Sequence, residues 1–324
     1  MKQFIISIAL VLATTTASAG NIVFRFHSGL QAEALRKNME TQISNLLTEI
    51  DNAAAEERTL SLDNIKMTAG ARTSLGNFWS NFRFSCDSPE NIEKCITDVN
   101  GYEVRNIPVT LKPVTEGYKG ELSKELTISF TRDGEITGVH MALANNVYHE
   151  IMTKGRDFTD VRRRAEILKF VEEFRSYYDE KDLNALNNIY SEDALIITGK
   201  VVMKKAGGDS PQLKPEIVYT KQNKTQYLTN LARTFRNNKY IRVTFDNIRV
   251  MRHGAKPQYY GVTLHQHWKS SNYEDDGYVF LLWEFPEDEN QSPTIHVRTW
   301  QPDQLGGEPL NEKEIINMND FLIQ

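Results

Sequence analysis

The chain has 324 residues, of which 40% are hydrophobic and 25% are charged. This length exceeds that of one ordinary domain, and the composition excludes a disordered or fibrous protein. The formal net charge of -5 and the pI near 5.9 exclude a strongly basic surface, so we expect no nucleic-acid partner.

Residues 1–19 have the pattern of a secretory signal peptide. Lys2 gives the positive start, residues 4–13 are apolar, and Ala17-Ser18-Ala19 is a small-residue cleavage site. The apolar stretch is too short to cross a bilayer, and no later stretch is long and apolar enough. We therefore expect an exported protein, periplasmic or secreted, without a membrane span.

The first domain is expected over residues 20–150 and begins with helices. After a short strand at residues 21–26, Ser28 is a candidate N-cap for a helix with one apolar stripe. A second apolar unit covers residues 60–67, and a further helix covers residues 74–82. The apolar period then changes to two at residues 104–111, 126–130 and 136–143, with a hairpin turn at Asp133-Gly134.

Cys86 and Cys95 are the only cysteines of the chain. In an oxidising compartment their spacing favours a disulfide that closes a short loop, and two free thiols packed apart are the alternative. The segment offers too few ligands for a metal site.

The boundary between the two domains is expected within residues 145–160, which have few periodic apolar positions. The second domain, expected over residues 151–324, begins with a helix at residues 161–178 whose outer face carries i,i+4 charge pairs typical of an exposed surface. Asp182 caps a short helix, a strand follows at residues 195–198, and a loop is expected at residues 199–215. Thr225 is the expected N-cap of the next helix.

Four long strands end this domain and form an antiparallel meander. They cover residues 240–250, 259–268, 277–285 and 294–300, and turn residues lie between them, including Asp275-Asp276-Gly277. The fold class is therefore α+β, with helices packed on a curved antiparallel sheet in each of two cone-shaped domains. The shared order of helices followed by strands suggests a diverged internal repeat, and an unrelated small α+β domain in front is the alternative.

Residues 161–301 resemble the nuclear transport factor 2-like superfamily, which includes ketosteroid isomerases and SnoaL-type cyclases. The resemblance rests on the long helix, on Asp182-Leu-x-x-Leu186, on the Tyr190-to-Ala194 turn and on Arg298-Thr-Trp300. It is similar to exported members from Gram-negative bacteria. It implies a cone with a small-molecule pocket, and dimers that form through sheet faces.

The resemblance argues against the best-known chemistry of that superfamily. The position of the isomerase's carboxylate base, five residues beyond Asp193, holds Thr198. The position near its oxyanion-donating tyrosine holds Phe174, although Tyr177 and Tyr178 are within a turn. Without the base, proton abstraction by that arrangement is disfavoured, and we predict no catalytic residue and no cofactor.

The candidate ligand-binding residues are aromatic or ionisable: Tyr178, Tyr190, His265, His267, Trp268, Trp283 and Glu284. His265 and His267 share one strand face, Gln266 and Trp268 the other, so only one pair can line a pocket. A metal would need a third ligand that the sequence does not show, so none is predicted.

The sequence favours an exported, non-enzymatic binding or scaffold protein for an unknown small molecule or protein. One alternative is an isomerase, dehydratase or hydrolase of the same superfamily that uses other pocket residues. Another is a structural envelope or assembly protein that uses its sheet faces.

Overall fold

The computed structural model describes residues 20–97, 101–114, 122–143, 151, 161–205, 213–286 and 291–321. The predicted signal peptide lies outside the described residues. So does the predicted boundary segment at residues 145–160, apart from Ile151. Among the described residues, no helix has the length and apolar character that crossing a membrane requires.

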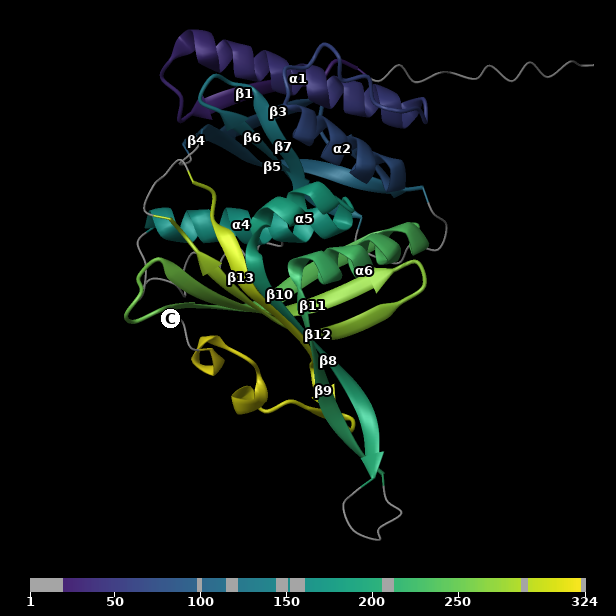
Figure 1. Cartoon of the computed structure of the whole chain (residues 1–324). Coiled ribbons are helices and arrows are strands. Elements are labelled where there is room, and N and C mark those ends of the chain that lie inside the picture. Colours follow the sequence, from purple (N-terminus) through teal and green to yellow (C-terminus); the bar gives the residue numbers. More distant parts are fainter. Residues whose placement is uncertain are drawn as a thin grey trace, which may run out of the picture.

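The first half packs two helices against an antiparallel sheet (Figure 1). The helices are α1 (Glu33–Ala55) and α2 (Ala69–Asn81). The sheet has the order β2-β5-β6-β7, with β4 also paired to β5. Its strands are β2 (Phe82–Cys86), β4 (Ile96–Thr97), β5 (Gly101–Pro113), β6 (Ser123–Thr131) and β7 (Ile136–Met141). A separate parallel pair joins β1 (Val23–Ser28) to β3 (Glu90–Lys94).

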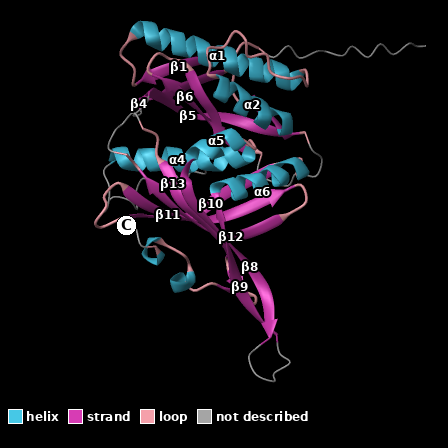
Figure 2. Cartoon of the chain, in the orientation of Figure 1, coloured by secondary structure: helices cyan, strands magenta, loops and turns pink. Residues whose placement is uncertain are grey.

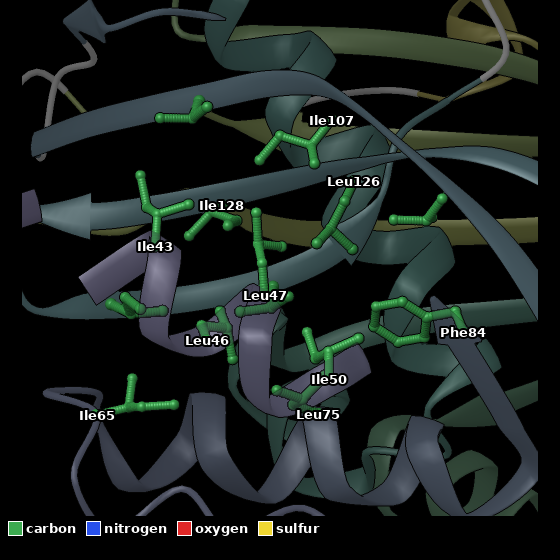
Figure 3. Packing of buried hydrophobic residues seen from close by; sticks show 14 of the residues in the cluster. Ile43, Leu46, Leu47, Ile50, Ile65, Leu75, Phe84, Ile107, Leu126 and Ile128 are labelled. Atoms are coloured by element: carbon green, nitrogen blue, oxygen red, sulfur yellow. The ribbon is translucent and has the colours of Figure 1, made fainter. Parts of the chain in front are cut away.

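The core of this half lies between the two helices and the sheet (Figure 3). The predicted stripe of α1 is buried there, with Ile43, Leu46 and Ile50 fully inaccessible to solvent. The predicted N-cap is wrong, because Ser28 ends β1 and Ala32 precedes the helix. The turn at Gly134 is confirmed by its positive φ of 75°.

The second half wraps a curved six-stranded sheet around three helices (Figure 2). The helices are α4 (Val161–Asp179), α5 (Leu183–Ile189) and α6 (Lys224–Asn237). The strand order is β10-β11-β12-β13-β8-β9, in which β13 and β8 are parallel. The strands are β8 (Tyr190–Lys205), β9 (Leu213–Asn223), β10 (Ile241–Arg252), β11 (Tyr259–Ser270), β12 (Glu274–Glu284) and β13 (Thr294–Pro302). The α+β class and the meander are confirmed.

Three local predictions in this half are corrected. The described part of the expected loop at residues 199–215 is extended, because β8 and β9 pair in register from Leu195 opposite Asn223 to Lys205 opposite Leu213. Asn223, not Thr225, caps α6, since its side chain accepts a hydrogen bond from the Gln226 amide. Residues 275–277 belong to β12 rather than to a turn.

The predicted disulfide is contradicted, because Cys86 and Cys95 are free thiols. The nine-residue spacing suggested a compact loop, but residues 90–94 are extended as β3, which pairs with β1 instead of closing a ring. Cys86 ends β2 opposite Val109, and Cys95 joins the buried core. Burial raises the pKa of the Cys86 thiol to about 12, helped by the nearby Asp51 carboxylate, and burial raises that of Cys95 to about 11.

Helix α4 lies between the two halves and carries buried charges (Figure 1). Arg105 of β5 donates two hydrogen bonds of 2.8 Å to the Glu172 carboxylate. His140 of β7 lies 2.8 Å from Glu180, and Arg242 of β10 bonds Asp179 at 2.8 Å. The Arg105–Glu172 and His140–Glu180 pairs therefore join the two halves through buried, paired groups. Of the face predicted to be exposed, Glu166, Lys169 and Glu173 are half-buried.

The two halves share an order of elements that supports the predicted repeat. In each half, helices precede four strands that pair as an antiparallel meander, β2-β5-β6-β7 and β10-β11-β12-β13. A parallel bridge joins Met67 to Ile136 at the start of β7, as β8 joins β13 in the second half. The described part of the first half has no counterpart of the β8–β9 hairpin. The tandem copy stays a prediction.

The C-terminal segment packs on the outer face of the six-stranded sheet. It contains β14 (Gln304–Leu305), β15 (Glu308–Pro309) and two short 3-10 turns. Met318 packs against Phe280 and Leu282, and the Phe321 ring stacks on Phe280 with centroids 5.4 Å apart. This segment covers part of the sheet face through which the predicted dimer would form, and the dimer stays a prediction.

Candidate functional site

A cavity of about 730 Å³ opens between α6 and the concave face of the six-stranded sheet. Residues of α6, β8, β11, β12 and β13 line it, so it lies inside the predicted cone. The lining residues that matter for its chemistry are Thr198, Tyr227, Gln266, Trp268, Tyr273, Asp275, Arg298 and Trp300.

Arg298 is the buried cation of this cavity, with only 6% of its surface exposed. Its guanidinium lies 5.3 Å from the centroid of the Tyr227 ring. No carboxylate among the described residues lies within ion-pair distance of it, and its Nε has no hydrogen-bond partner there. Burial acts to lower the pKa of Arg298, but neighbouring tyrosines outweigh this and raise it, so the guanidinium stays charged.

Three tyrosine hydroxyls form a hydrogen-bonded cluster beside Arg298. The Tyr178 hydroxyl is 2.7 Å from that of Tyr227 and 3.1 Å from that of Tyr190. Tyr178 comes from α4, Tyr190 from the start of β8 and Tyr227 from α6, so the cluster ties two helices to the sheet. Burial raises the pKa of Tyr190 and Tyr227 well above the ordinary value, so their hydroxyls stay protonated.

A β-bulge in β13 turns Arg298 toward the cavity. Leu282 pairs with Val297 but the next residue, Trp283, pairs with Ile295, so His296 is an extra residue in β13. Ile295 faces the inner core, and strict alternation from it would send Arg298 outward. The bulge reverses this, and Arg298 shares the inner face with its partner Leu281.

Two tryptophans supply aromatic walls. Trp268 of β11 lies edge-on to Tyr178 with ring centroids 5.9 Å apart, and Trp300 of β13 lies against β12. The position opposite the Trp300 ring must be a glycine, because a Cβ at Gly277 would lie 2.8 Å from ring atoms and 2.4 Å from the Gln301 carbonyl oxygen.

Asp275 is the half-buried carboxyl of the cavity. The Tyr273 hydroxyl donates a 2.8 Å hydrogen bond to its Oδ2. Burial raises the pKa of Asp275, and this outweighs the opposing effects of that hydrogen bond and of Arg298. The cavity thus combines a fixed cation, neutral hydroxyls and a carboxyl that protonates more readily than usual.

The structure does not bring the seven predicted ligand-binding residues together. Tyr178, Tyr190 and Trp268 meet at or behind the cavity. Trp283 is 1% exposed and packs against Phe170 in the core. Glu284 does not line the cavity, and its Oε2 lies 2.7 Å from His296 Nε2.

His265 and His267 lie on the opposite face of the sheet from Trp268. They contact Asp246, Asp276 and Asp303 rather than the cavity. Thr198, which occupies the position of the isomerase's carboxylate base, lines the cavity.

The sequence reasoning missed Arg298, Tyr227 and Asp275 as cavity residues. In the sequence Arg298 is visible only as part of the Arg298-Thr-Trp300 motif, and Asp275 is predicted to lie in a turn. The signal for Tyr227 was available, since it lies on the apolar stripe of α6 and carries a hydroxyl that needs a partner when buried.

No protein-family model matches the sequence, and no curated protein matches it. Among solved structures, Bd1075 of Bdellovibrio bacteriovorus is similar over 68% of this chain and 76% of its own, with 14% identity and a TM-score of 0.32. An NTF2-like protein of Cytophaga hutchinsonii matches 43% of this chain and 98% of its own, with 10% identity and a TM-score of 0.31. An NTF2-like protein of Pseudomonas putida matches 46% and 93%, with 9% identity and a TM-score of 0.33.

Solved NTF2-like proteins are thus among the structures to which this chain is similar, as the sequence resemblance predicted. The likeness concerns the fold alone.

Proposed function

We propose that the chain is an exported, non-enzymatic binding protein whose C-terminal cavity takes a small organic anion with an aromatic or apolar body. The observation that carries this proposal is Arg298, a buried cation that lines an open cavity and has no carboxylate partner among the described residues. A buried charge is expensive unless it is paired, so a ligand anion is the natural partner.

The geometry of Arg298 suits a carboxylate or a similar planar anion. A guanidinium presents parallel N–H donors that match two anionic oxygens, and such charge-assisted pairs are stronger than neutral hydrogen bonds. Tyr227 also lines the cavity, and its ring lies beside the guanidinium. A neutral ligand would leave the guanidinium with its tyrosine neighbours but without an anionic partner among the described residues.

The walls favour a ligand with a flat or apolar body. Trp268, Trp300 and Leu231 line the same cavity, and aromatic faces stack on planar groups. A cavity of about 730 Å³ lies within the range of about 300–1,000 Å³ that is usual for small-molecule sites.

The test compares matched ligands on the mature chain. Quenching of tryptophan fluorescence would be titrated with indole-3-carboxylate and with indole-3-carboxamide, which differ in charge but little in shape. The carboxylate should bind at least about tenfold more tightly, and Arg298→Gln should weaken its binding by about 30-fold or more, as expected for an ion pair removed from a buried site.

Arg249→Gln is the matched control, because it removes the same charge from a side chain that is 46% exposed and pairs with Glu312 away from the cavity. Thr234→Trp would fill the cavity without altering Arg298, so it should abolish binding. This variant keeps the proposal testable if the Arg298 variant does not fold. Equal binding of the carboxylate and the amide, or unchanged binding by a folded Arg298→Gln variant, would overturn the proposal.

A second candidate function is acid–base catalysis in the same cavity, which Asp275 favours. Its pKa is raised by burial, and a carboxyl with such a pKa can accept a proton from a bound substrate. In that case Asp275→Asn would abolish turnover while leaving binding of the organic anion intact. Binding that is lost together with turnover would assign Asp275 to ligand binding instead.

A further inference from the structure

Two histidines and three aspartates gather on the outer face of the six-stranded sheet, and one of them, Asp276, also borders the cavity. His265 and His267 lie on β11, Asp246 on β10, Asp276 on β12, and Asp303 just beyond β13. Candidate ligand atoms of Asp246, His265 and His267 all lie within 4.8 Å of one another. Asp246 is therefore the third ligand that the sequence alone did not show.

The central carboxylate faces one nitrogen of each imidazole. Asp246 Oδ1 is 2.9 Å from His265 Nδ1, and Asp246 Oδ2 is 2.9 Å from His267 Nε2. Ligand atoms around a tetrahedral zinc at its usual bond lengths lie about 3.4 Å apart, so an ion fits after a shift of about half an ångström.

The outer nitrogens of both imidazoles face a further carboxylate. His267 Nδ1 is 2.6 Å from Asp276 Oδ1, and His265 Nε2 is 3.4 Å from Asp303 Oδ2. The His265–Asp303 contact is an ion-pair distance without hydrogen-bond geometry, since His265 Nε2 has no hydrogen-bond partner. A carboxylate behind each metal-binding histidine fixes the tautomer that points its lone pair at the metal.

The backbone places Asp246 for this role. Asp246 pairs with His265, but Arg249 pairs with Thr263, so β10 carries one extra residue directly after Asp246. Asn247 within this bulge has a φ of 49°, in the left-handed region. Such bulges re-aim side chains, and here the bulge follows the carboxylate that contacts both histidines.

We propose that Asp246, His265 and His267 form a binding site for a divalent first-row transition metal ion, with Asp276 and Asp303 orienting the two histidines. Imidazole and carboxylate together suit zinc and its neighbours in the series. Three protein ligands leave at least one coordination position for water, and the side chains of His267 and Asp246 are each 41% exposed, so an ion can enter from solution.

Metal binding uses the lone pair of one nitrogen from each imidazole, so any proton on that nitrogen is released to solvent. His265 Nδ1 and His267 Nε2 are those nitrogens, because each faces the Asp246 carboxylate.

The experiment titrates the mature chain with Zn²⁺ by calorimetry and with Co²⁺ by visible absorption. Wild type should bind one ion per chain and give a Co²⁺ absorption band in the visible range. His265→Ala, His267→Ala and Asp246→Asn should each weaken binding at least about 100-fold and remove the band, and Asp276→Asn should weaken it by about 10- to 100-fold.

The controls separate this site from other donors of the chain. His253→Ala removes an imidazole from the β10–β11 turn, and a Cys86→Ser/Cys95→Ser double variant removes both thiols, so both should bind like wild type. Asp246→Asn keeps the side-chain shape, which guards against loss of binding through misfolding. Binding that survives the loss of both histidines, that disappears with the thiols, or that wild type does not show below 100 µM ion would refute the metal site.

Discussion

The buried ion pair between the halves allows a prediction about stability. Glu172 is 3% exposed and Arg105 is 6% exposed, and two hydrogen bonds of 2.8 Å join them. Glu172 also accepts a 2.6 Å hydrogen bond from the Leu143 amide. Glu172→Gln removes the negative charge and keeps the contact of Arg105 with Glu103, at 3.0 Å.

Removing one partner of a buried pair typically destabilises a protein by about 3–5 kcal/mol, because the other charge stays buried. We expect the apparent free energy of unfolding of Glu172→Gln, measured by urea titration, to fall by an amount in that range. Because the pair joins the two halves, the variant should also separate their unfolding into two transitions.

The matched control removes an exposed pair, Lys204–Glu216, whose side chains are 52% and 54% exposed. Glu216→Gln should change the free energy of unfolding by at most about 1 kcal/mol. Replacing Arg105 and Glu172 by methionine together with Glu103→Gln should recover part of the stability, because no buried charge of this cluster is then left without its partner. A Glu172→Gln variant within 1 kcal/mol of wild type would show that the interface does not depend on this charge.

Two further predictions concern buried titratable groups. Burial acts to lower the pKa of His140, but the Glu180 carboxylate outweighs this effect and raises that pKa. The contribution of the pair to the free energy of unfolding is therefore fully present below pH about 6.5, and it is lost as pH rises through the folded-state pKa. The stability difference between wild type and His140→Gln should therefore shrink from pH 6 to pH 9 in urea titrations, and a pH-independent difference would contradict this. Cys86 and Cys95 should resist alkylation in the native protein and should both react, without reductant, once it is unfolded, because each is a protonated free thiol. Mass spectrometry that finds neither modified after unfolding would reveal a disulfide.

The long periodic elements were predictable because their periodicity reflects the face that they bury. The stripe of α1 and the alternation of β10 to β13 produce patterns that survive without tertiary information. The capping position of α5 was also readable, since Asp182 accepts a hydrogen bond from the Ala185 amide, as a short polar side chain at that place should.

The predictions that failed depend on contacts between distant segments. Residues 199–215 contain Lys, Gly and Pro, which favour a loop, yet β8 and β9 pair there because the register set further down the hairpin continues. Cys86 and Cys95 are near in sequence, but β3 pairs with β1, more than 60 residues earlier, and this pairing keeps the segment extended. Local spacing carries no information about such a partner.

The cavity could not be predicted residue by residue because bulges decide which face a side chain joins. A strict alternation along β13 sends Arg298 outward, and only the extra residue at His296 returns it to the inner face. The outer cluster depends on a similar bulge after Asp246 in β10. A single-residue shift that no periodicity reveals therefore determines the charge in the cavity and the third ligand of the metal site.

The same strand serves both proposed sites, and this makes the two proposals separable. Along β11, Gln266 and Trp268 line the cavity while His265 and His267 face the opposite side. A change of side chain on one face leaves the backbone pairing of the other intact, so Arg298→Gln should abolish anion binding and leave zinc binding unchanged. His267→Ala should do the reverse, and loss of both functions in either variant would mean that the sheet itself had been disrupted.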